Sequence, residues 1–148
     1  MKEFLVAIDG SEGSEAAIDE ALALAQDVGA DITFAFVRKP PSTLLGTPYY
    51  ERLLCADLGQ ARATLDAARR RALETRVAMR SEIVEGDPVD EILSLADNRG
   101  VDLIVMGSRG RGALAGAVLG SVSSAVAQHA NVPVLVVKER AGRQLVAA

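Results

Sequence analysis

Gly107, Gly110, Gly120 and Ser121 have the residue types and the spacing that can hold a phosphate group. They follow the pattern G-x2-G-x9-G-S and come directly after the apolar run 103–106. Glycines let a backbone approach an anion closely and adopt positive φ. A helix that begins near Ser121 would direct free N–H groups and the positive end of its dipole into the same space. The segment therefore predicts a nucleotide-binding loop at the carboxyl end of a buried strand.

This segment differs from two other phosphate-binding motifs. It lacks the G-x4-G-K-[ST] pattern of the Walker A loop, since no lysine follows the glycines. Gly110 and Gly112 begin a G-x-G pattern, but the third glycine of a dinucleotide fingerprint is misplaced and the loop follows a late strand. The glycines could also be simple turn glycines, and their full spacing between a strand and a helix favours phosphate binding over that alternative.

No residues with an evident catalytic role accompany the loop. His129 is the only histidine and lies near the end of an expected helix, where a cation is favourable. Cys55 is the only cysteine and lies in an Ala- and Leu-rich stretch, which predicts a packed thiol. The His and Cys residues form no cluster with metal-ligand spacing, although Mg²⁺ could arrive with nucleotide phosphates.

Composition indicates one ordinary globular domain over residues 1–148. The chain is 49% apolar and 24% charged, and its net charge of −4 argues against nucleic acid and acidic membranes as partners. No apolar stretch approaches the roughly 20 residues that span a bilayer. The start of the chain lacks the regions of a signal peptide, and a single cysteine fits a reducing compartment, so we expect a cytoplasmic protein.

Short apolar runs alternate along the chain with longer amphipathic segments. Strands are expected at 4–8, 32–37, 77–84, 103–106 and 132–137, and helices at about 14–28, 49–74, 87–99 and 121–129. This alternation predicts an α/β fold with a mostly parallel, doubly wound sheet, in which ligands bind at the carboxyl ends of strands. Asp9, Val37 and the glycine segment all follow strands, so they could form one shared site. The proline-rich stretch 40–48 is either a lid over that site or a plain connection.

The chain resembles the universal stress protein family, specifically its ATP-binding branch. The resemblance runs from Val6-Ala7-Ile8-Asp9-Gly10-Ser11 to Pro133-Val134-Leu135-Val136-Val137, and its most specific parts are Gly107-Ser108-Arg109-Gly110 and Gly120-Ser121-Val122-Ser123. It implies a Rossmann-like, five-stranded parallel sheet of order 3-2-1-4-5, flanked by helices, with the site between the first and fourth strands.

The resemblance also implies a role for each residue of the site. Asp9 would contact the ribose hydroxyls, while its alternative role is to cap the following turn. Ser121 would bind phosphate and could also cap a helix. The other implied contacts are Ala7 and Ile8 beside adenine, the Val37 backbone on adenine, Met106 closing the adenosine pocket, Gly107, Gly110 and Gly120 at the ribose and phosphates, and the Val122 amide with Ser123 near the phosphate tail.

These residues favour an ATP-binding stress-response sensor or regulator with slow or no hydrolysis. A slow ATP hydrolase and a ligand-free, chaperone-like dimer remain alternatives, and AMP and cyclic AMP remain possible ligands. The last strand, Val134, Leu135, Val136 and Val137, is apolar on both faces and carries no protective charge. If it ends the sheet, its open edge predicts a homodimer through antiparallel pairing, as the resemblance also implies.

Overall fold

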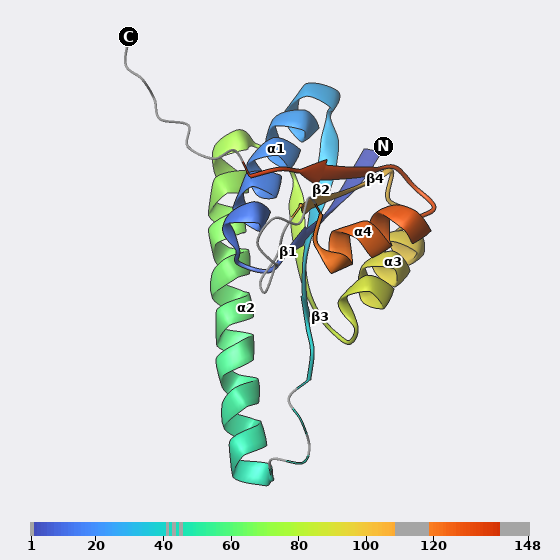
Figure 1. The fold of residues 1–148 in the computed structure, drawn as a ribbon. Helices are drawn as coiled ribbons and strands as arrows, with labels where there is room; N and C mark the ends of the chain where they lie inside the picture. Colours follow the sequence, from blue (N-terminus) through green and yellow to red (C-terminus); the bar gives the residue numbers. More distant parts are fainter. Residues whose placement is uncertain (1, 41, 43, 45, 109–118, 140–148) are drawn as a thin grey trace.

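The computed structural model describes residues 2–40, 42, 44, 46–108 and 119–139. The described chain forms a parallel five-stranded sheet with two helices on each face (Figure 1). In chain order the elements are β1 (Lys2–Ile8), α1 (Glu12–Val28), β2 (Ala30–Arg38), α2 (Thr47–Thr75), β3 (Met79–Glu85), α3 (Pro88–Arg99), β4 (Leu103–Gly107), α4 (Ser121–His129) and β5 (Val134–Val137).

The strand order is β3-β2-β1-β4-β5, which confirms the expected doubly wound topology. Strand β1 lies at the centre and pairs in parallel with both β2 and β4. Strands β3 and β5 are the two edges of the sheet. Because β1 and β4 are neighbours with their following helices on opposite faces, their carboxyl ends form the topological switch point.

Two apolar layers cover the two faces of the sheet. Helices α1 and α2 pack on one face around Val6, Phe34 and Phe36, and α3 and α4 pack on the other around Leu5 and Ile104. The central strands are therefore buried on both sides, which explains why they read in the sequence as nearly continuous apolar runs.

The caps expected for the first and third helices are confirmed. The Asp87 side chain accepts a hydrogen bond from the Asp90 N–H and begins α3, and Gly29 and Gly100 end α1 and α3 in the left-handed conformation at φ 69° and 61°. Helix α1 starts two residues earlier than expected, at Glu12, because the Ser11 hydroxyl accepts from the Ser14 N–H and caps it.

Helix α2 continues well beyond the sheet. Its first buried residue is Ala61, and the residues before it are exposed or half-buried. Figure 1 shows this first part of α2 projecting past the carboxyl end of β2. Cys55 lies in the projecting part and is exposed, so the expectation of a packed thiol is wrong: none of the strands that the structure describes packs against this part of α2.

None of the helices in the described chain has an apolar stretch of the length that crossing a bilayer requires.

Candidate functional site

The candidate site lies at the switch point between the carboxyl ends of β1 and β4. Val6 pairs with Val105, so Ile8 and Gly107 end the two strands side by side. Ile8 also pairs with Phe36, which brings Val37 of β2 level with Asp9. The topology therefore brings together, at the carboxyl end of the sheet, the three strand ends that the sequence analysis predicted to form the site.

Asp9 makes the turn that leads from β1 into α1. Its Oδ1 accepts a hydrogen bond of 2.9 Å from the Ser11 N–H, which fixes Ser11 as the cap of the helix. The turn-capping role weighed for Asp9 is thus present. A carboxylate has two oxygens and several acceptor positions, so this role is compatible with a ligand contact.

Gly107 is required by the packing of α1 on β4. A Cβ atom placed there would lie 2.7 Å from both the carbonyl carbon and the oxygen of Gly13, in the first turn of α1. Such a distance is far inside van der Waals contact, and the backbone cannot move away as a flexible side chain would. Gly107 therefore allows the start of α1 to sit directly against the end of β4.

A hydrogen-bonded clasp joins the two ends of the glycine segment. The Gly120 N–H donates to the Ser108 carbonyl at 2.6 Å, and the buried Ser123 hydroxyl lies 3.1 Å from the carbonyls of both Ser108 and Gly120. The Ser108 N–H in turn donates to the Val137 carbonyl of β5 at 2.9 Å. Chain segments that are twelve positions apart are thereby held together at the end of β4.

The clasp positions the start of α4 at the carboxyl end of β4. Gly120 is the N-cap residue of α4 and provides no side-chain cap, and Ser121 is exposed in the first turn. The capping role considered for the Ser121 hydroxyl is not observed, since Ser121 lies inside the helix rather than before it. Gly110 lies outside the described residues.

The apolar site residues divide between the two faces of the sheet. Ile8 is buried in the layer under α1 and α2. Met106 is 5% exposed and belongs to the opposite layer, where Ala7, Val37 and Val122 also pack. Met106 thus packs as a core side chain, and its expected contact with adenosine stays a prediction.

The sequence reasoning missed Ser108 and Gly13 as contributors to the site. Ser108 was read only as part of the glycine pattern, although its carbonyl is the centre of the clasp. Gly13 was not singled out, yet a glycine within the first turn of a helix is an unfavourable choice that signals a close backbone approach.

Arg38, which ends β2 next to Val37, was also missed. Its guanidinium is only 8% exposed and donates to Glu85 of β3 at 2.6 Å, while its Nη1 atom is buried without a hydrogen-bond partner. The pair ties the ends of β2 and β3 together beside the candidate site. Arginine at the end of an apolar strand gives no sequence signal for such a buried pair.

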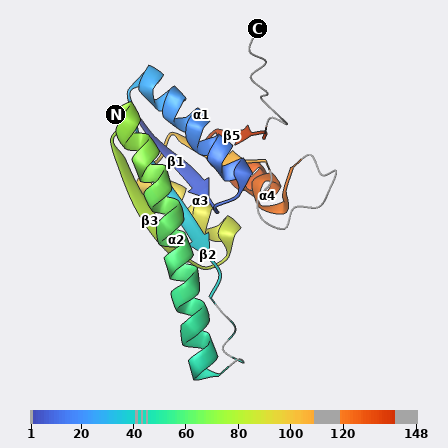
Figure 2. The ribbon, with the colours of Figure 1, turned by 90° about the vertical axis from the view of Figure 1, so that its left-hand side faces the viewer.

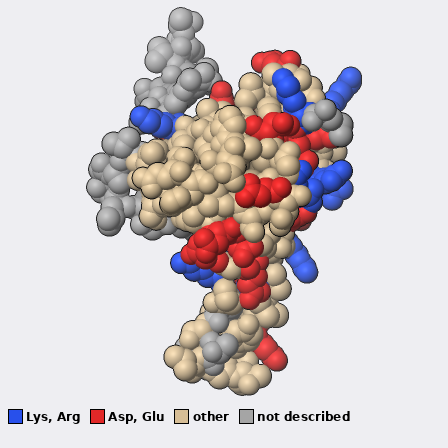
Figure 3. Space-filling model, turned by 90° about the vertical axis from the view of Figure 1, so that its right-hand side faces the viewer, with Lys and Arg blue, Asp and Glu red and all other residues tan. Residues whose placement is uncertain are grey.

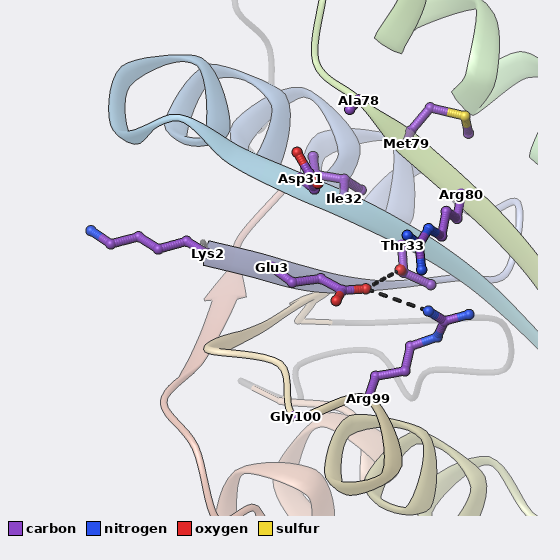
Figure 4. A pocket seen from close by; sticks show the side chains of 10 residues that line it. All are labelled: Lys2, Glu3, Asp31, Ile32, Thr33, Ala78, Met79, Arg80, Arg99 and Gly100. Carbon is purple, nitrogen blue, oxygen red and sulfur yellow. Dashed lines mark hydrogen bonds and ion pairs between the residues drawn. The ribbon is translucent and has the colours of Figure 1, made fainter.

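A separate pocket of about 270 Å³ opens at the amino ends of the strands, away from the candidate site. Figure 4 shows Glu3 at its centre, where the Thr33 hydroxyl donates to a Glu3 oxygen at 2.6 Å and Arg99 forms an ion pair with it. Arg99 also binds Glu82 of β3. The group links α3 to β1 and β3, so its charges hold the fold together.

The fold defines a doubly wound α/β protein, with Gly107 at the end of β4 and Gly120 at the start of α4 beside its switch point. The family model described as "Universal stress protein family" matches residues 1–138, and the chain belongs to this family.

Similar proteins cover nearly the whole chain. Universal stress protein YxiE of Bacillus subtilis is 35% identical over an alignment of 145 residues that covers 92% of this chain and 98% of the relative. The structure of protein MJ0577 of Methanocaldococcus jannaschii superposes with a TM-score of 0.84 at 28% identity, over 95% of this chain and 98% of the other. A universal stress protein solved in complex with cAMP superposes with a TM-score of 0.73 at 30% identity, over 92% and 96% of the two chains.

Proposed function

We propose that this protein binds an adenine nucleotide, with ATP the favoured ligand, between the carboxyl ends of β1 and β4, and that it acts as a stress-response sensor or regulator. The clasp of Ser108, Gly120 and Ser123 is the observation that carries this proposal. It holds Ser108 and Gly120 together at the end of β4, the strand that pairs with β1, and the helix that starts at Ser121 has N–H groups that can bind an anion. The related structure with bound cAMP supports an adenine nucleotide as the ligand class.

The contacts expected of the ligand follow from these positions. Asp9 would hold the ribose, the Val37 backbone would contact adenine, and Gly107, Gly110 and Gly120 would let the backbone approach the phosphates. The Ser121, Val122 and Ser123 amides lie in the first turn of α4, where the helix dipole favours an anion. Mg²⁺ would be held mainly by the phosphates and by water.

Hydrolysis is expected to be slow or absent. Rapid phosphoryl transfer needs a group that positions the attacking water, together with strong electrostatics at the phosphates. Asp9, the carboxylate that we place at the ligand, uses Oδ1 to hold a backbone turn. A turnover on the order of 10 per second, typical of enzymes, would contradict a sensing role.

The deciding experiment is to denature the purified protein and identify any released nucleotide by mass spectrometry. Calorimetric titration of stripped protein with ATP and Mg²⁺ follows, beside Gly110→Val and the control Gly59→Val at an exposed position of α2. Binding that is lost in the first variant and kept in the control supports the site. Failure of ATP, AMP and cyclic AMP to bind would favour the ligand-free alternative, and decay of bound ATP to ADP as the main activity would favour the hydrolase.

We also propose that the protein is a cytoplasmic homodimer paired through β5. The outer edge of β5 carries no charged side chain between Val134 and Val137, and all four residues are only partly buried. Such an edge is open to pairing with a second copy. Cell fractionation that recovers the protein with membranes or in the medium would overturn the cytoplasmic location.

A further inference from the structure

Arginines without ion pairs gather along the β3 edge of the sheet. Arg62, Arg69 and Arg76 of the α2 region and Arg80 of β3 are exposed, and the described structure gives none of them a salt bridge or side-chain hydrogen bond. Figure 3 shows several basic side chains along one side of the molecule, with acidic side chains among them. This is unexpected in a protein whose net charge is −4.

The geometry of α2 turns two of these arginines toward that rim. Arg62 and Arg69 each follow a buried alanine by one position, whereas Arg71 precedes the buried Ala72. At 3.6 residues per turn, Arg62 and Arg69 lie on the flank of α2 opposite to Arg71. Arg71 forms ion pairs with Glu15 and Asp19 of α1, so the other flank faces away from α1, and Figure 2 shows β3 on that side.

The acidic residues of β3 do not neutralise this rim. Glu82 is bound to Arg99 of α3, and Glu85 is bound to the buried Arg38 of β2. Both carboxylates are therefore engaged in ion pairs within this chain, although the Glu85 side chain is still 48% exposed. Asp66, exposed on α2 between Arg62 and Arg69, is one acidic group against several free guanidinium groups.

The backbone of β3 offers hydrogen bonds along the same rim. The Ile32 N–H donates to the Ala78 carbonyl, and the Gly86 N–H donates to the Arg38 carbonyl, so the even-numbered residues of β3 pair with β2. Successive residues of a strand direct their backbone groups to opposite sides. Ser81 and the other odd-numbered residues thus turn N–H and C=O groups outward, where the described chain places no further strand.

We propose that the β3 edge docks an extended acidic segment of another protein, which pairs with β3 as an added strand. Its backbone would bond to the outward groups of β3, as in other cases of strand addition. Its side chains would point alternately to the α2 face, where Arg62 and Arg69 lie, and to the opposite face. On that face Arg80 lines the pocket with Lys2 and Arg99, and with the carboxylates of Glu3 and Asp31. This docking surface is separate from the proposed nucleotide site, which lies at the carboxyl ends of β1 and β4.

Protection of the edge is a weaker explanation for these charges. Sheet edges often carry charged residues that prevent pairing with other chains, and Arg80 alone could do this. Arg62 and Arg69 stand on the helix beside the edge, however, and cations on both faces attract an acidic strand as strongly as they repel a basic one. Charge complementarity of this kind gives specificity and speeds association.

Fluorescence anisotropy tests this docking on the full chain. The probe is a short labelled peptide that repeats the unit Glu-Glu-Thr. We expect binding that weakens as salt is added, and that falls about tenfold in Arg69→Glu/Arg80→Glu. Arg69→Gln/Arg80→Gln should lower the affinity in the same direction with less disturbance of the surface. The matched control is Arg52→Glu, an exposed arginine of α2 on its projecting part, which should bind as the wild type does.

Ser81→Pro separates strand addition from loose charge attraction. It removes an outward N–H without touching the bonds between β3 and β2, and edge strands tolerate proline. We expect it to abolish peptide binding, and we expect the peptide to slow amide exchange in β3 of the wild type. Equal binding of a Lys-for-Glu peptide, equal weakening in Arg52→Glu, or unchanged binding in Ser81→Pro would overturn the proposal. Tighter binding of single-stranded nucleic acid at the same arginines would also overturn it.

Discussion

The backbone of Gly107 lies so close to Gly13 that no side chain fits between them. Gly107→Ala should therefore force β4 and α1 apart and lower the free energy of unfolding by about 1 to 3 kcal/mol, as overpacked cores do. Because the same movement displaces the start of the glycine segment, nucleotide affinity should also fall. Urea denaturation and calorimetric titration measure the two effects.

Gly59→Ala is the matched control for that substitution. Gly59 lies within α2, and a Cβ atom placed there would meet no other atom within 4 Å. Alanine is the better helix former, so this variant should be more stable by up to about 1 kcal/mol and should bind nucleotide normally. If Gly107→Ala behaved like Gly59→Ala, the close contact with Gly13 would have no energetic importance.

Ser123 contributes to the clasp through one hydroxyl. Ser123→Ala leaves the Ser108 and Gly120 carbonyls without that donor in a buried position, and should cost about 1 kcal/mol of stability. Nucleotide affinity should fall as well, since both ends of the glycine segment are then held less firmly. Ser124→Ala, one position along α4, is the comparison that should retain both stability and affinity.

At the scale of elements, regular structure could be predicted where burial and caps agree. The strand β1, the cap Asp87 and the terminating glycines Gly29 and Gly100 were all readable, because each has one favourable local conformation. The start of α1 was placed too late, since its capping residue, Ser11, was read as part of the turn. Contacts between distant segments, such as Gly13 with Gly107 or Arg38 with Glu85, left no comparable signal.

The site was predictable at the level of strand ends, and much less at the level of side chains. Asp9, Val37 and Gly107 lie at one end of the sheet because parallel strands place their carboxyl ends together. The roles of Ser108 and Ser123 in the clasp depend on three-dimensional closure of the segment, which a linear pattern does not contain. Met106 shows the same limit, because its position after a strand did not reveal that its side chain turns into the core.

Helix α2 should differ in stability along its length. Residues 47–60 lie beyond the sheet, whereas Ala61, Leu65, Ala68 and Ala72 pack into the core. Amides of the projecting part should therefore exchange with solvent hydrogen through local opening, at rates well above those of the packed part. Hydrogen-exchange mass spectrometry resolves the two parts, and equal protection of both would show that a partner covers the projection in solution.

At the scale of the whole molecule, the sheet has two open edges with different chemistry. The β3 edge is flanked by arginines, and the β5 edge is apolar along Val134–Val137. Identical chains that pair through the arginine-flanked edge would bring like charges together, whereas pairing through β5 buries apolar side chains. The two edges are therefore suited to two kinds of partner, an acidic segment at β3 and a second copy at β5.

Proline at Val136 tests the homodimer with little disturbance of the sheet. The N–H groups of Ile104 and Ser108 donate to the Pro133 and Val137 carbonyls, so the odd-numbered residues of β5 pair with β4 and Val136 turns its backbone groups outward. Val136→Pro removes one outward donor and leaves those bonds intact. We expect sedimentation velocity to show a shift from dimer to monomer, and Leu135→Glu to act in the same direction by placing a charge in the interface.

Ser81→Pro, which blocks the opposite edge in the same way, should remain dimeric. Leu135 also packs against the core beneath α1 and α2, so Leu135→Glu could unfold the protein as well as separate the dimer. Circular dichroism distinguishes these two effects. If Val136→Pro and Leu135→Glu are both folded and dimeric, β5 does not form the interface. If Ser81→Pro is the variant that becomes monomeric, the second copy pairs through β3, and the arginines on that rim must then face acidic groups of the partner chain.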